Sequence, residues 1–223
     1  MDNLADDREG QEPHFDCMDI SALMGPPVQR QELARVLDDV ADDVRFKSVY
    51  ELGRTDLARL FEAAADNAPL KLDHFVPADI PVGAEVVHWG KNSLRLFRRF
   101  QKRFCRPAAR ASQLWGYNEH PLRYLTGPGY FVAREDEAKQ VVVDYGALPT
   151  LPGGNLPREW PRVAGNDAGL ARLVFGGKRD LLRRVSNTVS VGRVEQNGRS
   201  LDIWFALVRV TGRFSSTDPF PRP

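Results

Sequence analysis

The residues best suited to bind a charged group gather between positions 86 and 118, a stretch without aspartate or glutamate. Eight lysines and arginines fall within it, among them Arg95, Arg98, Arg99 and Lys102. Guanidinium and ammonium groups bind carboxylates and phosphates through charge-assisted hydrogen bonds. Because the 223-residue chain carries a formal net charge of only +1, this local excess indicates a surface or pocket rim that meets an anionic group.

Aromatic side chains accompany these cations and extend into the second half of the chain. Small-molecule pockets are mostly apolar, with a few polar groups converging on them. We therefore expect an aromatic-lined cavity with lysine or arginine from residues 91–106 at its mouth. The candidate ligand-binding residues are Trp89, Trp115, Tyr117, Tyr130, Trp204, Arg95, Arg98, Arg99 and Lys102.

Three polar residues are weaker candidates for acid–base catalysis. Glu119 and His120 are adjacent, and an imidazole beside a carboxylate could transfer protons if both reached a pocket. Neighbours on an extended chain point to opposite sides, so we favour a loop histidine hydrogen-bonded by the backbone. Asp144 interrupts the apolar run 141–145. Its pKa would rise if it faced a cavity, but we favour a solvated strand residue.

Signatures of metal, nucleotide and triad sites are missing from the sequence. Four scattered histidines and two isolated cysteines, Cys17 and Cys105, lack ligand spacing. The glycines at 127–129 and 176–177 match no phosphate loop, and no serine has a GxSxG context. We therefore expect no cofactor and no metal. Free thiols, the absence of a secretory signal and the lack of a long apolar run predict a cytoplasmic protein without a transmembrane segment.

The N-terminal third is predicted to hold an acidic leader followed by helices. Residues 1–27 are acidic and poor in apolar periodicity, which is typical of a disordered leader. In the helical segment 28–69, apolar residues at helical spacing predict one helix through positions 33–44 and another over 55–66. Residues 1–46 contain twelve acidic and four basic residues. They either fold back over the basic stretch or form a separate solvated face.

Residues 94–106 are predicted to form a central basic amphipathic helix. On a helical wheel Phe97, Phe100 and Phe104 share one arc, arginines and lysines occupy the opposite arc, and Pro107 ends the pattern. The basic face could dock on an anionic membrane, a nucleic acid or an acidic partner. The alternative is a surface helix with its phenylalanines in the core and its charges in water.

Residues 70–211 are predicted to form a β-rich core domain, followed by a flexible tail over 212–223. Strands at 130–134 and 140–145 form one hairpin, and strands at 188–195 and 200–210 form another around Asn197-Gly198, a dipeptide that tolerates positive φ angles. Between them lies the short apolar run 170–175, and Gly176-Gly177 is predicted to open a helical turn over 178–185.

Strand 201–210 is apolar on both faces, so it needs cover on both sides. A barrel interior plus a packing helix would supply that cover, as would a central place in a helix-covered sheet. The order of helices first and antiparallel strands later favours an α+β fold or a closed barrel with helical additions.

Two segments carry a resemblance to a known family. The pattern 189–193, a polar turn and then 203–207 resembles the last two strands of lipocalin-like (calycin-type) barrels in uncharacterised bacterial proteins. The step Trp89-Gly90-Lys91 resembles the Trp-x-Gly-Lys element that opens some of those barrels. The resemblance implies a mainly antiparallel, at least partly closed barrel with a cavity for a small apolar molecule. It does not imply catalysis.

Three functions follow as hypotheses. The first is binding of a small apolar or amphiphilic molecule, with an anionic group as one option, in an aromatic-lined cavity with a basic rim. The second is an interaction protein that docks through helix 94–106. The third is an enzyme that acts on a small organic substrate through His120, Glu119 or Asp144. A cavity reached by His120 or Asp144 would favour catalysis, and exposed phenylalanines in 94–106 would favour docking.

Overall fold

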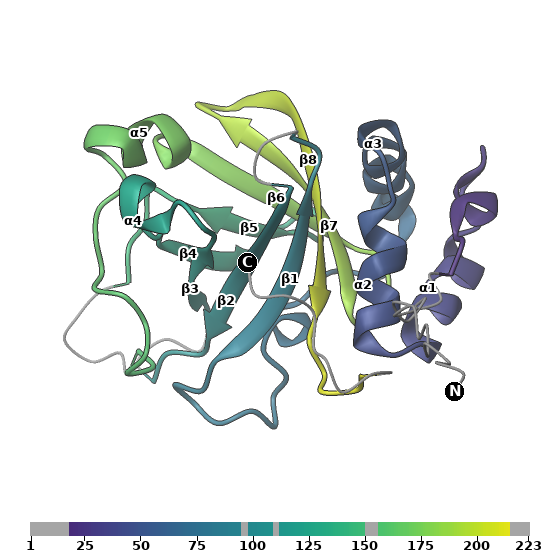
Figure 1. Cartoon of the computed structure of the whole chain (residues 1–223), viewed down its shortest axis with the longest axis horizontal. Helices are drawn as coiled ribbons and strands as arrows, with labels where there is room; N and C mark the ends of the chain where they lie inside the picture. The colour runs from purple at the N-terminus through teal and green to yellow at the C-terminus, as the bar shows by residue number, and fades with distance from the viewer. Residues whose placement is uncertain (1–17, 95–97, 109–111, 150–155, 215–223) are drawn as a thin grey trace, which may run out of the picture.

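The computed structural model describes residues 18–94, 98–108, 112–149 and 156–214, and its centre is a closed antiparallel barrel of eight strands (Figure 1). Each strand pairs with the next along the chain, and β8 returns to pair with β1. Closure leaves no sheet edge exposed. The strands are β1 Val86–Asn92, β2 Arg99–Cys105, β3 Leu114–Glu119, β4 Phe131–Glu135, β5 Val141–Asp144, β6 Lys178–Arg184, β7 Val189–Gln196 and β8 Arg199–Arg209.

Helices cover one side of this barrel and border one end. In Figure 1, α2 and α3 lie against the wall formed by β1, β7 and β8, while α4 and α5 lie beside the upper end. The α+β class and the mainly antiparallel, closed barrel expected from the sequence are confirmed, and the eight-stranded barrel is consistent with a lipocalin-like fold. The helical elements are η1 Ser21–Met24, α1 Arg30–Asp39, α2 Asp42–Tyr50, α3 Arg54–Ala63, η2 Ala64–Asp66, η3 Leu72–His74, α4 Arg123–Thr126 and α5 Gly169–Phe175.

Strand β8 shows why the barrel needs both an inner filling and an outer cover. Ile203, Phe205 and Leu207 belong to the cluster inside the barrel, whereas Ala206 and Val208 belong to the cluster beneath the helices. Because successive side chains of a strand point to opposite faces, an apolar residue at nearly every position requires cover on both sides. The prediction for strand 201–210 is therefore confirmed.

Both predicted hairpins are confirmed. Strands β4 and β5 pair antiparallel, as do β7 and β8. Asn197 and Gly198, which connect β7 and β8, have φ angles of 51° and 77°. Asparagine and glycine tolerate this left-handed region better than other residues, so the turn chemistry determines where the chain reverses.

The predicted helix over 94–106 is wrong, because Arg99–Cys105 is strand β2 and residues 95–97 lie outside the described chain. Phe100 and Phe104 lie inside the barrel, packed in or against its core. A spacing of four residues satisfies a helical period and a strand period alike, so the pattern did not distinguish them. Hydrogen bonding to β1 on one side and β3 on the other decides for the strand.

One further expectation is corrected in the second half. Lys178–Arg184, predicted as a helical turn, is strand β6 and pairs with β5 and β7. The short apolar run 170–175, for which the sequence predicted neither helix nor strand, lies in helix α5. Short segments of this kind have too few turns for their periodicity to distinguish the two structures.

The predicted N-terminal helices are present, but the apolar stripe 33–44 belongs to two of them. Val40 adopts an extended conformation between α1 and α2. Arg45 packs at the connection between α1 and α2: it is fully buried, pairs with Asp42 and donates to the carbonyl of Leu37. Ahead of α1, Ile20 and Met24 of the predicted leader are buried against the helices.

Within the described residues, acids of the N-terminal segment pair locally: Glu32 and Asp39 with Arg35, and Asp42 with Arg45. The basic stretch draws its acidic partners from elsewhere, namely Asp73, Glu85 and Asp180. A fold-back of the acidic segment over residues 86–118 remains a prediction for positions 1–17, which lie outside the described chain.

Candidate functional site

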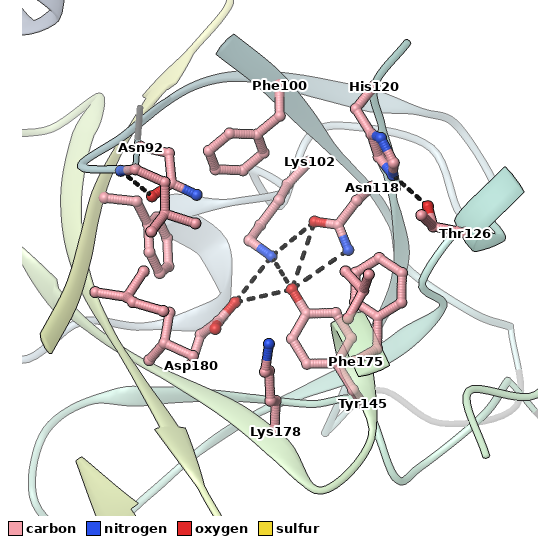
Figure 2. Close-up of a pocket in the computed structure, with 15 residues that line it drawn as sticks. Asn92, Phe100, Lys102, Asn118, His120, Thr126, Tyr145, Phe175, Lys178 and Asp180 are labelled. Atoms are coloured by element: carbon pink, nitrogen blue, oxygen red, sulfur yellow. Dashed lines mark hydrogen bonds and ion pairs between the residues drawn. The ribbon is translucent and has the colours of Figure 1, made fainter. Parts of the chain in front are cut away.

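A cavity of about 140 Å³ opens at the barrel end bordered by α4 and α5. Its wall is mostly apolar and includes Phe100, Phe175 and Phe205 together with a few polar groups. Figure 2 shows Phe100 and Phe175 beside the polar groups. Toward the other end, the interior is filled by rings, including Phe75, His88 and Phe104. The lining residues are Asn92, Leu94, Phe100, Lys102, Asn118, His120, Thr126, Tyr145, Val174, Phe175, Lys178, Asp180, Val194, Ile203 and Phe205.

The polar groups of the cavity converge on the ammonium group of Lys102. It donates to Asp180 Oδ2 at 2.9 Å, to Asn118 Oδ1 at 2.9 Å and to the Tyr145 hydroxyl at 2.5 Å. The Tyr145 hydroxyl in turn donates to Asp180 Oδ2 at 2.9 Å. All three protons of the ammonium thus have acceptors, which a charge removed from water requires.

Four separate strand regions supply this network. Lys102 comes from β2, Asn118 from β3, Asp180 from β6, and Tyr145 follows directly after β5. Each occupies an inward position in the alternation of its strand. A backbone contact orients Asn118, because its amide nitrogen donates to the carbonyl of Gly129 at 3.0 Å. Closure of the barrel therefore brings together residues up to 78 positions apart (102 to 180).

Two glycines make room for the aromatic walls. A side chain at Gly90 of β1 would collide with the ring of Phe100, and one at Gly192 of β7 would collide with the ring of Phe205. Because these glycines carry no side chain, the rings can lie close to the backbone of β1 and β7 and still line the cavity. The Trp-Gly-Lys step of the predicted barrel opening thus contributes a glycine that positions a cavity wall.

Burial governs the ionisation of the polar groups. Desolvation lowers the pKa of Lys102, and the adjacent Asp180 carboxylate opposes that shift. Desolvation also lowers the pKa of Lys178, again opposed by Asp180. Burial and the Asp180 charge raise the pKa of Tyr145 well above its usual value, so its hydroxyl stays protonated.

The charges in the cavity do not balance. Lys102 and Lys178 present two ammonium groups, whereas Asp180 presents one carboxylate. Lys102 is ion-paired with Asp180, but Lys178 has no ion pair or hydrogen bond of its side chain within the described part of the chain. Figure 2 shows its amino group pointing toward the space between Asp180 and Tyr145.

Of the three catalytic candidates, only His120 lines the cavity. Its Nε2 lies 3.4 Å from the Thr126 hydroxyl, and desolvation lowers its pKa, so the ring is neutral. Glu119 points to the outer face and pairs with Arg123 at 2.9 Å. Asp144 faces outward, pairs with Arg179 at 3.2 Å and does not line this cavity.

The aromatic candidates stand on the outer face of the barrel. Tyr117 and Tyr130 pack with Trp160, and Trp115 belongs to the same outer cluster. Trp89 packs on Phe46 of α2, and Trp204 packs on Phe61 of α3. None of these five candidates lines the cavity.

The basic candidates divide between the two faces. Lys102 points into the cavity, whereas the guanidinium groups of Arg98 and Arg99 lie over the ring of Tyr50 on the outside. Arg95 lies outside the described residues. Of the eight predicted ligand-binding residues that the structure describes, only Lys102 lines the cavity.

Sequence reasoning missed Asn118, Tyr145, Lys178 and Asp180. A strand assignment for 178–184 would have placed Lys178, Asp180 and Leu182 on one face and revealed two charges at inward positions. Tyr145 directly follows Asp144, and the question of which of the two faces inward depended on register.

Searches of this chain against known protein families, curated proteins and solved structures return no match. The described residues contain no cluster of three histidine, cysteine or acidic side chains able to hold a metal ion. None of the helices in the described ranges is long and apolar enough to cross a membrane.

Proposed function

We propose that this protein binds a small, mainly apolar molecule bearing one acidic group, with the apolar part inside the barrel and the acidic group beside Lys178. The observation that carries the proposal is the charge imbalance of the cavity: two ammonium groups face one carboxylate. A bound carboxylate would neutralise the remaining charge and accept a charge-assisted hydrogen bond.

The size and lining of the cavity support a compact ligand. An apolar cavity of about 150 Å³ is large enough to take up benzene, and the cavity here measures about 140 Å³. Phe100, Phe175 and Phe205 offer ring faces and edges to an apolar or aromatic group. A longer chain would extend through the open mouth, which α4 and α5 border.

Benzoate and benzamide are suitable probes, because they share size and shape but differ in charge. Titration calorimetry on the whole protein should show benzoate binding at least about tenfold more tightly, since a hydrogen bond to a charged group contributes about 1.5–3 kcal/mol. Equal affinity for the two probes would refute the proposed charge recognition.

Lys178 can be tested with a matched pair of variants. Lys178→Met should remove the preference for benzoate while leaving benzamide binding unchanged, because the apolar cavity persists. Lys178→Arg retains the positive charge and should retain the preference. If both variants bind benzoate as the unmodified protein does, Lys178 is not the anchor and the proposal fails.

A further inference from the structure

Exposed apolar side chains concentrate around the mouth of the barrel. Eight large apolar side chains are exposed in the described residues, and six of them lie at this end, with exposed fractions from 40% to 87%. They border the opening, which Leu94, Thr126 and Val174 line. The mouth patch consists of Leu94, Leu122, Tyr124, Leu125, Leu170 and Leu173.

Two short helices present most of this patch. Tyr124 and Leu125 lie on α4, and Leu170 and Leu173 lie on α5. The two helices contact each other, and Figure 1 shows them together beside the same end of the barrel. Their buried residues, Thr126 and Phe175, face the cavity. Contiguous exposed apolar patches on the surface of a globular protein mark interaction sites.

The charges around the patch are predominantly positive. Three acidic residues at this end are already paired with arginines: Glu119 with Arg123, Asp144 with Arg179 and Glu195 with Arg193. Asp167 before α5 and the exposed Glu51, which lies near Lys91, add two further negative charges at this end. Against them stand three exposed arginines that have no acidic partner within the described ranges, Arg98, Arg172 and Arg199.

We propose that the mouth patch docks on an anionic lipid bilayer, with its leucines among the acyl chains and the surrounding arginines at the headgroups. Apolar residues rimmed by unpaired cations match the two layers of such a surface. The apolar cavity opens within the patch, so docking places its mouth against the membrane, where an apolar acid partitions. This docking goes beyond ligand binding, which does not require it.

Vesicle flotation tests the proposal with the full chain. The protein should float with vesicles of phosphatidylcholine and phosphatidylglycerol, float less with phosphatidylcholine alone, and dissociate at high salt, because exposed charges are screened. Failure to bind the mixed vesicles at low salt would overturn it.

Matched variants locate the contact. The double variant Leu125→Ser/Leu173→Ser should weaken partition at least about 30-fold, because two leucines no longer leave water. Val82→Ser is the control: Val82 is 54% exposed but precedes β1, at the opposite end of the barrel. Its partition should match that of the unmodified protein, and an equal loss in both variants would refute docking at the mouth.

Two further measurements separate membrane docking from self-association and from ligand binding. Light scattering after size exclusion should show a monomer; a dimer that the double variant abolishes would assign the patch to a second copy of the chain and overturn the membrane proposal. Benzoate titration of the double variant should match the unmodified protein. Loss of benzoate binding in every form, with vesicle binding intact, would refute the proposed ligand and leave the docking surface standing.

Discussion

The buried pair of Lys102 and Asp180 allows a quantitative prediction about stability. Both side chains are at least 96% buried, and the ammonium nitrogen lies 2.9 Å from the carboxylate oxygen. At an effective dielectric constant of about 20, two unit charges at that distance attract by about 6 kcal/mol. Desolvation of both groups offsets much of this attraction, so the pair as a whole adds little net stability.

Removing one partner should destabilise the fold, because the remaining charge keeps its desolvation cost without the opposite charge that compensated it. Asp180→Asn preserves the shape of the side chain and removes its charge. We expect it to lower the free energy of unfolding at pH 7 by about 3–5 kcal/mol. Lys102→Met should have a smaller effect, because the Lys178 ammonium group still interacts with Asp180. Replacing both, as Lys102→Met/Asp180→Leu, should cost less than either single change, since Tyr145 and Asn118 can still hydrogen-bond each other.

Urea denaturation followed by tryptophan fluorescence measures these free energies. The pH dependence adds a second check. In Asp180→Asn the folded-state pKa of Lys102 falls further below the usual 10.5, because its favourable partner is gone. Between the folded-state and unfolded-state pKa values of Lys102, the unfolded chain binds more protons than the folded protein. The stability of Asp180→Asn therefore rises with pH, and its loss of unfolding free energy should shrink toward pH 10.5.

Two results would refute this reasoning. Single variants that lose less than about 1 kcal/mol would show that the charges are not desolvated. A double variant that loses the sum of the two single effects would show that the groups are not coupled.

Three further predictions concern the rest of the fold. Replacing Phe61 of α3, which is wholly buried against Trp204, by alanine should lower the free energy of unfolding by about 3–5 kcal/mol, as measured by urea denaturation. A loss below about 1 kcal/mol would contradict its place at the helix–barrel interface. Burial raises the pKa of Cys105 to about 12, so in a Cys17→Ser background the native thiol should not react with a chromogenic disulfide at pH 8 but should react in urea; rapid reaction of the native form would disprove its burial. Burial lowers the pKa of His88 to about 3, so as the pH falls the unfolded chain takes up a proton at this residue before the folded protein does. The free energy of unfolding should therefore fall by up to about 1.4 kcal/mol per pH unit below pH 6.5. His88→Phe should flatten that slope, and an unchanged slope would assign the effect to other groups.

Local patterns in the sequence were enough for the outline of the fold. Asn197-Gly198 determined one hairpin through backbone conformation, and the doubly apolar strand 201–210 demanded a barrel or sheet covered by helices. Both signals depend only on neighbouring residues, because turn geometry and strand alternation are local properties. The presence of N-terminal helices followed in the same way, although Val40 divides the first of them.

The tertiary structure decided which face each residue presents, and with it the composition of the site. Phe100 and Phe104 fit a helix and a strand equally, and only pairing with β1 and β3 selects the strand that turns Lys102 inward. The predicted tryptophans are large and apolar, yet they pack outside, where helices and the segment around Trp160 cover them. The cavity needs barrel closure to join Lys102, Asn118, Tyr145 and Asp180, because register between distant strands is a property of the whole sheet. The acid-free stretch that the sequence shows thus contributes Lys102 and Asn118 to the site, while Tyr145 and Asp180 come from later parts of the chain that only the fold brings beside them.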